Sequence, residues 1–164
     1  MKRAFLLAGA CAIFAAPAFA QSATTPSTPD FVKKAAISDM FEIRSSELAL
    51  NKKVTADRTF AKTMIHDHTE TSEQLKGLVK SGEVKAEVPA DLDSEHQQML
   101  DQLGKESGAS FDKDYDQMQL KGHEEAVALF KSYAENGDDP ALKRWAAKTL
   151  PHLEHHLAMA KKLS

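Results

Sequence analysis

Four ionisable side chains fall on the faces that four predicted helices should bury: Glu42, His68, His123 and His156. Each shares a stripe of helical spacing with apolar or small residues. Burying a carboxylate and three imidazoles costs free energy unless they pair, hydrogen-bond or bind an ion. Imidazoles and carboxylates are ligands of zinc, copper and iron. The pattern therefore predicts a site for a transition metal, or for a small polar ligand, inside a helical bundle.

The same residues support a second interpretation. Glu42 could serve as the counter-charge of hydrogen-bonded core histidines, in a polar network that fixes helix register without any ligand. The protein would then be a non-catalytic structural or stress-related protein of the cell envelope. The sequence leaves both interpretations open.

Two neighbouring residues are candidates for auxiliary roles. Asp67 lies at the edge of its stripe, where we expect it to accept a hydrogen bond from His68. His152 precedes His156 by four residues and could add a ligand. The remaining histidines are expected on outer faces: His66, His96 and His155.

The elements that position these residues are helices delimited by capping residues and glycines. Their expected ranges are 31–52 after Asp30, 56–80 after Thr55, a short helix 94–103 starting at Ser94, 111–136 after Ser110, and a last helix from Pro140 after Asp139. Pro151 is expected to kink the last one. Strand and hairpin signals are absent. We expect an all-α fold, an up-down four-helix bundle with an extra short helix before the third long one.

An axial estimate tests whether the four residues can meet. At about 1.5 Å per residue, Glu42 and His68 lie about 16 and 21 Å from the first turn. His123 and His156 lie about 21 and 28 Å from the last turn. These levels agree within about a turn and a half, so one shared layer is possible.

The N-terminal segment predicts export. Lys2 and Arg3 precede a short apolar run, and Ala18-Phe19-Ala20 is typical of a signal-peptidase site. We expect residues 1–20 to be a cleaved secretory signal, 21–29 a disordered tether and 30–164 the bundle domain, in a periplasmic or secreted protein. A lipoprotein anchored through Cys11 is disfavoured because apolar residues follow that cysteine.

Composition excludes several function classes. The formal net charge is −3 and the single cysteine is Cys11. An acidic chain is a poor partner for nucleic acid, and without further cysteines neither disulfides nor thiolate sites can form.

No later stretch is long and apolar enough to cross a membrane. No nucleophile triad or phosphate loop indicates an enzyme. The remaining partners are a metal ion, a small ligand or an envelope protein.

The chain resembles a bacterial family of secreted, ferritin-like four-helix proteins of unknown function, often labelled "predicted outer membrane protein". The resemblance covers about residues 31–163. It is carried by Phe31–Ala35, Glu42, Met64–His68 with Leu75, Phe111-Asp112 with Tyr115 and His123, and Leu150-Pro151 with Leu153 and His156-Leu157. It implies a ferritin-like bundle outside the cytoplasm but no activity or cofactor. The chain lacks the Glu-x-x-His motif of di-iron bundles, which disfavours ferritin-type iron oxidation.

Overall fold

The computed structural model describes residues 25–52 and 57–163, and within these ranges the chain forms five helices and no strand. The helices are α1 Thr28–Asn51, α2 Arg58–Lys80, α3 Ser94–Lys105, α4 Ala109–Asn136 and α5 Pro140–Ala160. The expected all-α bundle with an extra short helix is thus confirmed at this level. The predicted signal peptide and residues 21–24 of the predicted tether lie outside the described residues. None of the described helices is long and apolar enough to cross a membrane.

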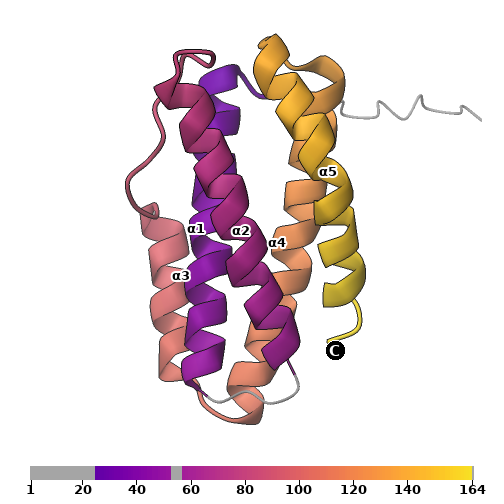
Figure 1. The fold of residues 1–164 in the computed structure, drawn as a ribbon. Coiled ribbons are helices and arrows are strands. Elements are labelled where there is room, and N and C mark those ends of the chain that lie inside the picture. The colour runs from indigo at the N-terminus through magenta and orange to yellow at the C-terminus, as the bar shows by residue number, and fades with distance from the viewer. Residues whose placement is uncertain (1–24, 53–56, 164) are drawn as a thin grey trace, which may run out of the picture.

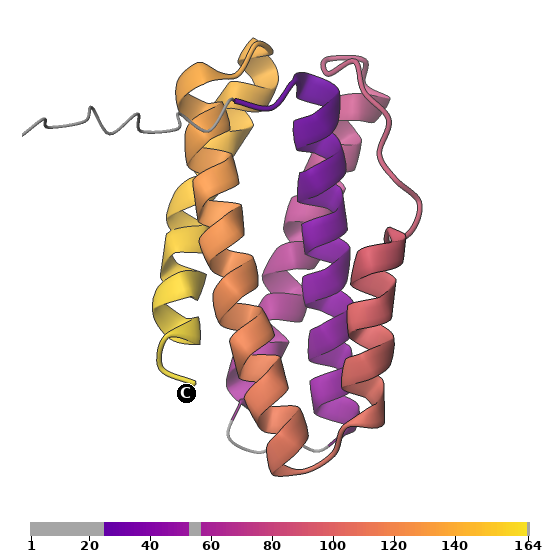
Figure 2. The same cartoon turned by 180° about the vertical axis from the view of Figure 1, so that it is seen from behind.

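The four long helices form a ring. Helix α1 packs against α2 and α4, and α5 packs against α4 and α2 (Figures 1 and 2). Helices α2 and α4 therefore lie on opposite corners of the ring. The chain between them runs along the outside, and α3 packs there against α1 and α4.

Local capping residues explain where the helices begin. Asp139 accepts a hydrogen bond from the Leu142 amide at 2.8 Å, and Pro140 takes the first helical position, as expected. At α1 the expected cap, Asp30, is wrong, because the Ser27 side chain caps the helix by accepting from the Asp30 amide. Helix α1 thus includes two residues, 28 and 29, that were expected in the tether. Helix α3 starts at Ser94, as expected, and the Asp93 side chain caps it by accepting from the His96 amide.

The start of α4 also differs from expectation. The helix begins at Ala109, preceded by Gly108 at φ +57°, a conformation that favours glycine, and no side chain caps it. The expected Ser110 cap is therefore wrong. The expected Thr55 cap of α2 lies outside the described residues. Helix α5 continues through Pro151 to Ala160.

Two apolar clusters fill the bundle interior. One packs Phe31, Leu75, Phe130, Tyr133 and Trp145 together, and the other contains Phe60, Met64, Leu103, Phe111 and Tyr115. On each long helix the buried polar residues, apart from Thr28 and Thr149, lie between the stretches that enter these clusters. They include Asp39, Glu42, Ser45, Ser46, His68, Ser72, Gln119, His123 and His156. The core is therefore two apolar layers separated by a polar one.

Candidate metal centre

Two of the three buried histidines are held by neighbours on other helices. His68 Nδ1 of α2 donates to Asp39 Oδ1 of α1 at 2.8 Å. Asp39 is itself buried, and its second oxygen accepts from Ser72 at 3.3 Å. His156 Nε2 of α5 donates to Asp67 Oδ2 of α2 at 2.9 Å. A carboxylate thus fixes the orientation of each ring.

The third histidine is held by its own helix. His123 Nδ1 donates to the backbone oxygen of Gln119, one turn earlier on α4, at 2.8 Å. A carbonyl oxygen can only accept, so Nδ1 must carry the proton and Nε2 must have a free lone pair in the neutral ring. The same reasoning applies to the other two rings, whose partners are carboxylates.

The second ring nitrogen of each histidine is buried and unpaired. His68 Nε2, His123 Nε2 and His156 Nδ1 have no hydrogen-bond partner within residues 25–52 and 57–163. One ring nitrogen of each histidine lies within 4.8 Å of one from each of the others, and the three ring centroids are 5.4 to 5.6 Å apart. When the partnered nitrogen of a neutral ring carries the proton, the unpaired nitrogen of that ring has a free lone pair.

The electrostatic environment shifts the pKa values of two of the histidines in opposite directions. Burial, together with positive charge on His68 and His123, lowers the pKa of His156 to about 4 despite its bond to Asp67. Burial also acts to lower the pKa of His68, but the hydrogen bond and charge of Asp39 outweigh it and raise the pKa. A neutral, outwardly anchored imidazole is the form that binds a metal ion.

Glu42 lies beside the histidines without joining them. Its Oε1 is 4.0 Å from His123 Nδ1, the nitrogen already bonded to Gln119, and its Oε2 has no partner among the described residues. The group of mutually close ligand atoms contains the three histidines only. Of the four residues proposed from sequence, the structure brings three together and places Glu42 beside one of them, His123, but outside the group.

The proposed auxiliary residues take different positions. Asp67 bonds His156, not His68, and its other oxygen accepts from the exposed His66 at 2.8 Å. His152 is exposed and lies outside the group, as His155 does. His96 is half-buried and bonds Asp93, so it is less exposed than expected.

Sequence reasoning missed Asp39, although a signal for it existed. Asp39 precedes Glu42 by three residues, so both lie on neighbouring positions of one helix face. Asp39 reaches α2 and Glu42 approaches α4. The acidic pair at this spacing could have predicted that α1 supplies orienting groups to histidines on both neighbours.

Comparison with protein-family models identifies the family of this chain. A family model described as "Domain of unknown function (DUF4142)" matches residues 14–163. The chain belongs to this family. No curated protein and no solved structure matches it. Membership of the DUF4142 family agrees with the resemblance to a helical family of unknown function, and it assigns no activity to the three histidines.

Proposed function

We propose that this DUF4142 protein binds one transition-metal ion in its core through His68, His123 and His156. The observation that supports this most is the group of three buried histidines, each with one anchored and one unpaired ring nitrogen, whose ligand atoms lie within 4.8 Å of one another. A purely structural network would be expected to pair these nitrogens, because each unpaired buried polar atom costs about 1–3 kcal/mol.

The donor set restricts the ion. Three imidazole nitrogens suit zinc and copper, whereas magnesium and calcium require oxygen ligands. A zinc ion sits about 2.0–2.1 Å from each nitrogen, and the three ligand nitrogens lie within 4.8 Å of one another. Iron(II) is the weaker alternative because nitrogen ligands generally bind it less tightly than copper(II) or zinc. Three protein ligands leave a fourth position for water or a small ligand.

The setting of the site is part of the proposal. The ring of four long helices with a site in its interior supports a ferritin-like, up-down arrangement. The basic, apolar and small-residue order of the first 20 residues supports export to the periplasm or beyond. An exported protein with an interior metal site would act as a metal-binding protein of the envelope; nothing in the three-histidine group requires catalysis.

Elemental analysis and calorimetry test this proposal. The purified protein, without a histidine tag, is stripped with chelator and titrated separately with Zn²⁺ and Cu²⁺. We expect one equivalent to bind and to raise the melting temperature, since a ligand of the folded state stabilises it by mass action.

Substitutions locate the ion. His68→Ala, His123→Ala and His156→Ala should each abolish stoichiometric binding, whereas the exposed controls His152→Ala and His155→Ala should retain it. No bound ion in the wild type, or binding that only the control substitutions weaken, would overturn the proposal. In the first case the structural network becomes the better interpretation.

A further inference from the structure

A second feature lies outside the three-histidine group. A cavity of about 880 Å³ opens between α1, α3 and α4. Its walls carry the apolar side chains Ile37, Phe41, Met99, Met118 and Leu129. None of the three clustered histidines lines it. Charged and polar side chains complete the walls, and a cavity of this size can hold a small organic molecule.

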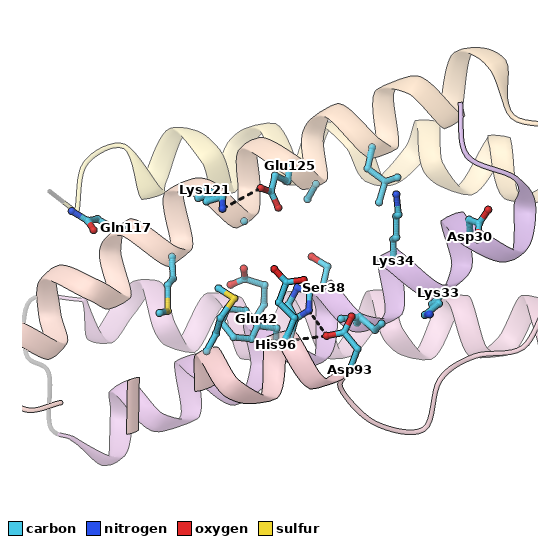
Figure 3. A pocket seen from close by; sticks show the side chains of 18 of the residues that line it. Asp30, Lys33, Lys34, Ser38, Glu42, Asp93, His96, Gln117, Lys121 and Glu125 are labelled. Carbon is cyan, nitrogen blue, oxygen red and sulfur yellow. Dashed lines mark hydrogen bonds and ion pairs between the residues drawn. The ribbon is translucent and has the colours of Figure 1, made fainter. Parts of the chain in front are cut away.

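Glu42 connects this cavity to the polar layer. Its side chain lines the cavity and is seen in Figure 3 between α1 and α4, yet the residue is only 2% exposed. Its Oε2 accepts no hydrogen bond from any described residue. A Cβ atom added to Gly122 would lie 2.9 Å from Oε1, so the carboxylate occupies space that only glycine leaves open on α4. A buried carboxylate without a donor is costly, and a donor from a ligand would remove that cost.

The charges around the cavity indicate the sign of the ligand. Six carboxylate residues line it against three lysines: Asp30, Glu42, Asp93, Glu95, Asp114 and Glu125 against Lys33, Lys34 and Lys121. Some of these charges are already satisfied, because Lys121 pairs with Glu125 at 3.7 Å and His96 bonds Asp93 at 2.7 Å (Figure 3). The balance is negative, which attracts cations and repels anions.

We propose that this cavity binds an organic ammonium ion with an apolar body, whose nitrogen donates to Glu42. The apolar body would contact Phe41 and the methionines, which adapt to irregular shapes. Phe41 and His96 pack edge to face with their ring centroids 5.5 Å apart, and they offer aromatic surface to a cation.

Binding of a matched series of probes tests the proposal. The chelator-treated protein is titrated calorimetrically with 2-phenylethylammonium, neutral 2-phenylethanol and anionic 3-phenylpropanoate, which share one apolar body. We expect the ammonium ion to bind with a Kd below about 1 mM and the other two at least about tenfold more weakly. Amide shifts in NMR spectra should concentrate on α1, α3 and α4.

Two substitutions distinguish the anchor from the walls. Glu42→Gln keeps the shape of the side chain and should weaken ammonium binding at least about tenfold. Met99→Trp should fill the cavity and abolish binding while leaving Glu42 in place. The control Glu47→Gln, on the exposed side of α1, should leave the affinity unchanged.

Several results would overturn the proposal. These are equal affinity for the alcohol and the ammonium ion, unchanged affinity in Glu42→Gln, or no binding to the folded wild type at about 10 mM probe. The comparison of probes uses the wild type, so it decides even if a variant fails to fold. Because the metal has been removed, the result is also independent of whether the three histidines bind an ion.

Discussion

The apolar cluster around Phe31, called the aromatic layer below, and the polar layer of this bundle are both buried, but they differ in how their polar atoms are hydrogen-bonded. In the aromatic layer, the Trp145 indole donates to Gln74 at 3.1 Å and the Tyr133 hydroxyl donates to Asp138 at 3.0 Å. In the polar layer, by contrast, each histidine pairs one ring nitrogen and leaves the other unpaired. The first layer satisfies its hydrogen-bonding groups as a stable core should.

The buried polar atoms without a hydrogen-bond partner are concentrated in the polar layer. Of the six buried side-chain atoms without a partner in the described parts of the chain, five belong to the polar layer: Glu42 Oε2, His68 Nε2, Gln119 Oε1, His123 Nε2 and His156 Nδ1. Because the rest of the core shows that this sequence can satisfy its polar groups, their concentration in one layer favours a binding role over imperfect packing.

The largest effect should come from the aromatic layer. Phe31 is fully buried and stacks on Tyr133 with ring centroids 4.1 Å apart. Phe31→Ala should reduce the free energy of unfolding by about 3–5 kcal/mol through lost burial and a residual cavity. Urea unfolding would measure this with and without Zn²⁺. We expect the same loss in both conditions, and a loss that appears only with zinc would contradict the separation of the two layers.

A substitution in the polar layer should behave in the opposite way. His123→Leu removes an unpaired buried nitrogen and fills similar space, so the metal-free protein should change by less than about 1 kcal/mol. Zinc at 100 times its Kd should stabilise the wild type by about 2.7 kcal/mol and the variant not at all. A strong destabilisation of the metal-free protein would instead show that His123 serves the fold.

Helical periodicity in the sequence was enough to predict which histidines are buried. The stripes through His68, His123 and His156 follow from spacings of three and four, and all three residues are buried where expected. The last helix start was also predictable, because Asp139 and Pro140 act through local backbone geometry. Such local signals do not depend on how the helices are rotated against each other.

The partners across helices were not predictable in the same way. Asp67 was expected to orient His68, yet it bonds His156 of α5, while His68 bonds Asp39 of α1. The buried stripe of α2 is compatible with either pairing of Asp67, with His68 or with His156. Only the rotation of α2 about its axis within the ring decides which pairing forms. Glu42 shares the buried stripe of α1, but it lies beside His123 of α4 and lines the cavity, outside the group of three histidines.

The sixth unpaired atom, Asp116 Oδ1, lies outside the polar layer and has another explanation. Burial, with the charges of Asp57 and Asp112, raises the pKa of Asp116 from 3.8 to about 6. The folded state therefore holds this proton more tightly than the unfolded state, so stability should fall as the pH rises from about 4 to about 6. Asp116→Asn should flatten this slope and raise the melting temperature at pH 7.5 by about 3 °C.

Thermal unfolding between pH 4 and 8 checks this prediction against a control on the surface. Asp101 is exposed, so Asp101→Asn should leave the slope unchanged. If Asp116→Asn lowered the melting temperature at pH 7.5, the carboxylate would have a stabilising partner, and the explanation by protonation would fail.

The smallest effect should come from two helical glycines. Gly77→Ala on α2 meets nothing within 4 Å, so it should stabilise the protein by up to about 1 kcal/mol through helix propensity. Gly122→Ala on α4 gains the same propensity but forces the flexible Glu42 carboxylate to move, because the new Cβ would lie 2.9 Å from its Oε1. Its net stability change should therefore be smaller than that of Gly77→Ala, as urea unfolding of both variants would show. An equal gain at both positions would mean that Glu42 relocates without cost and that its place beside Gly122 is not enforced by the surrounding packing.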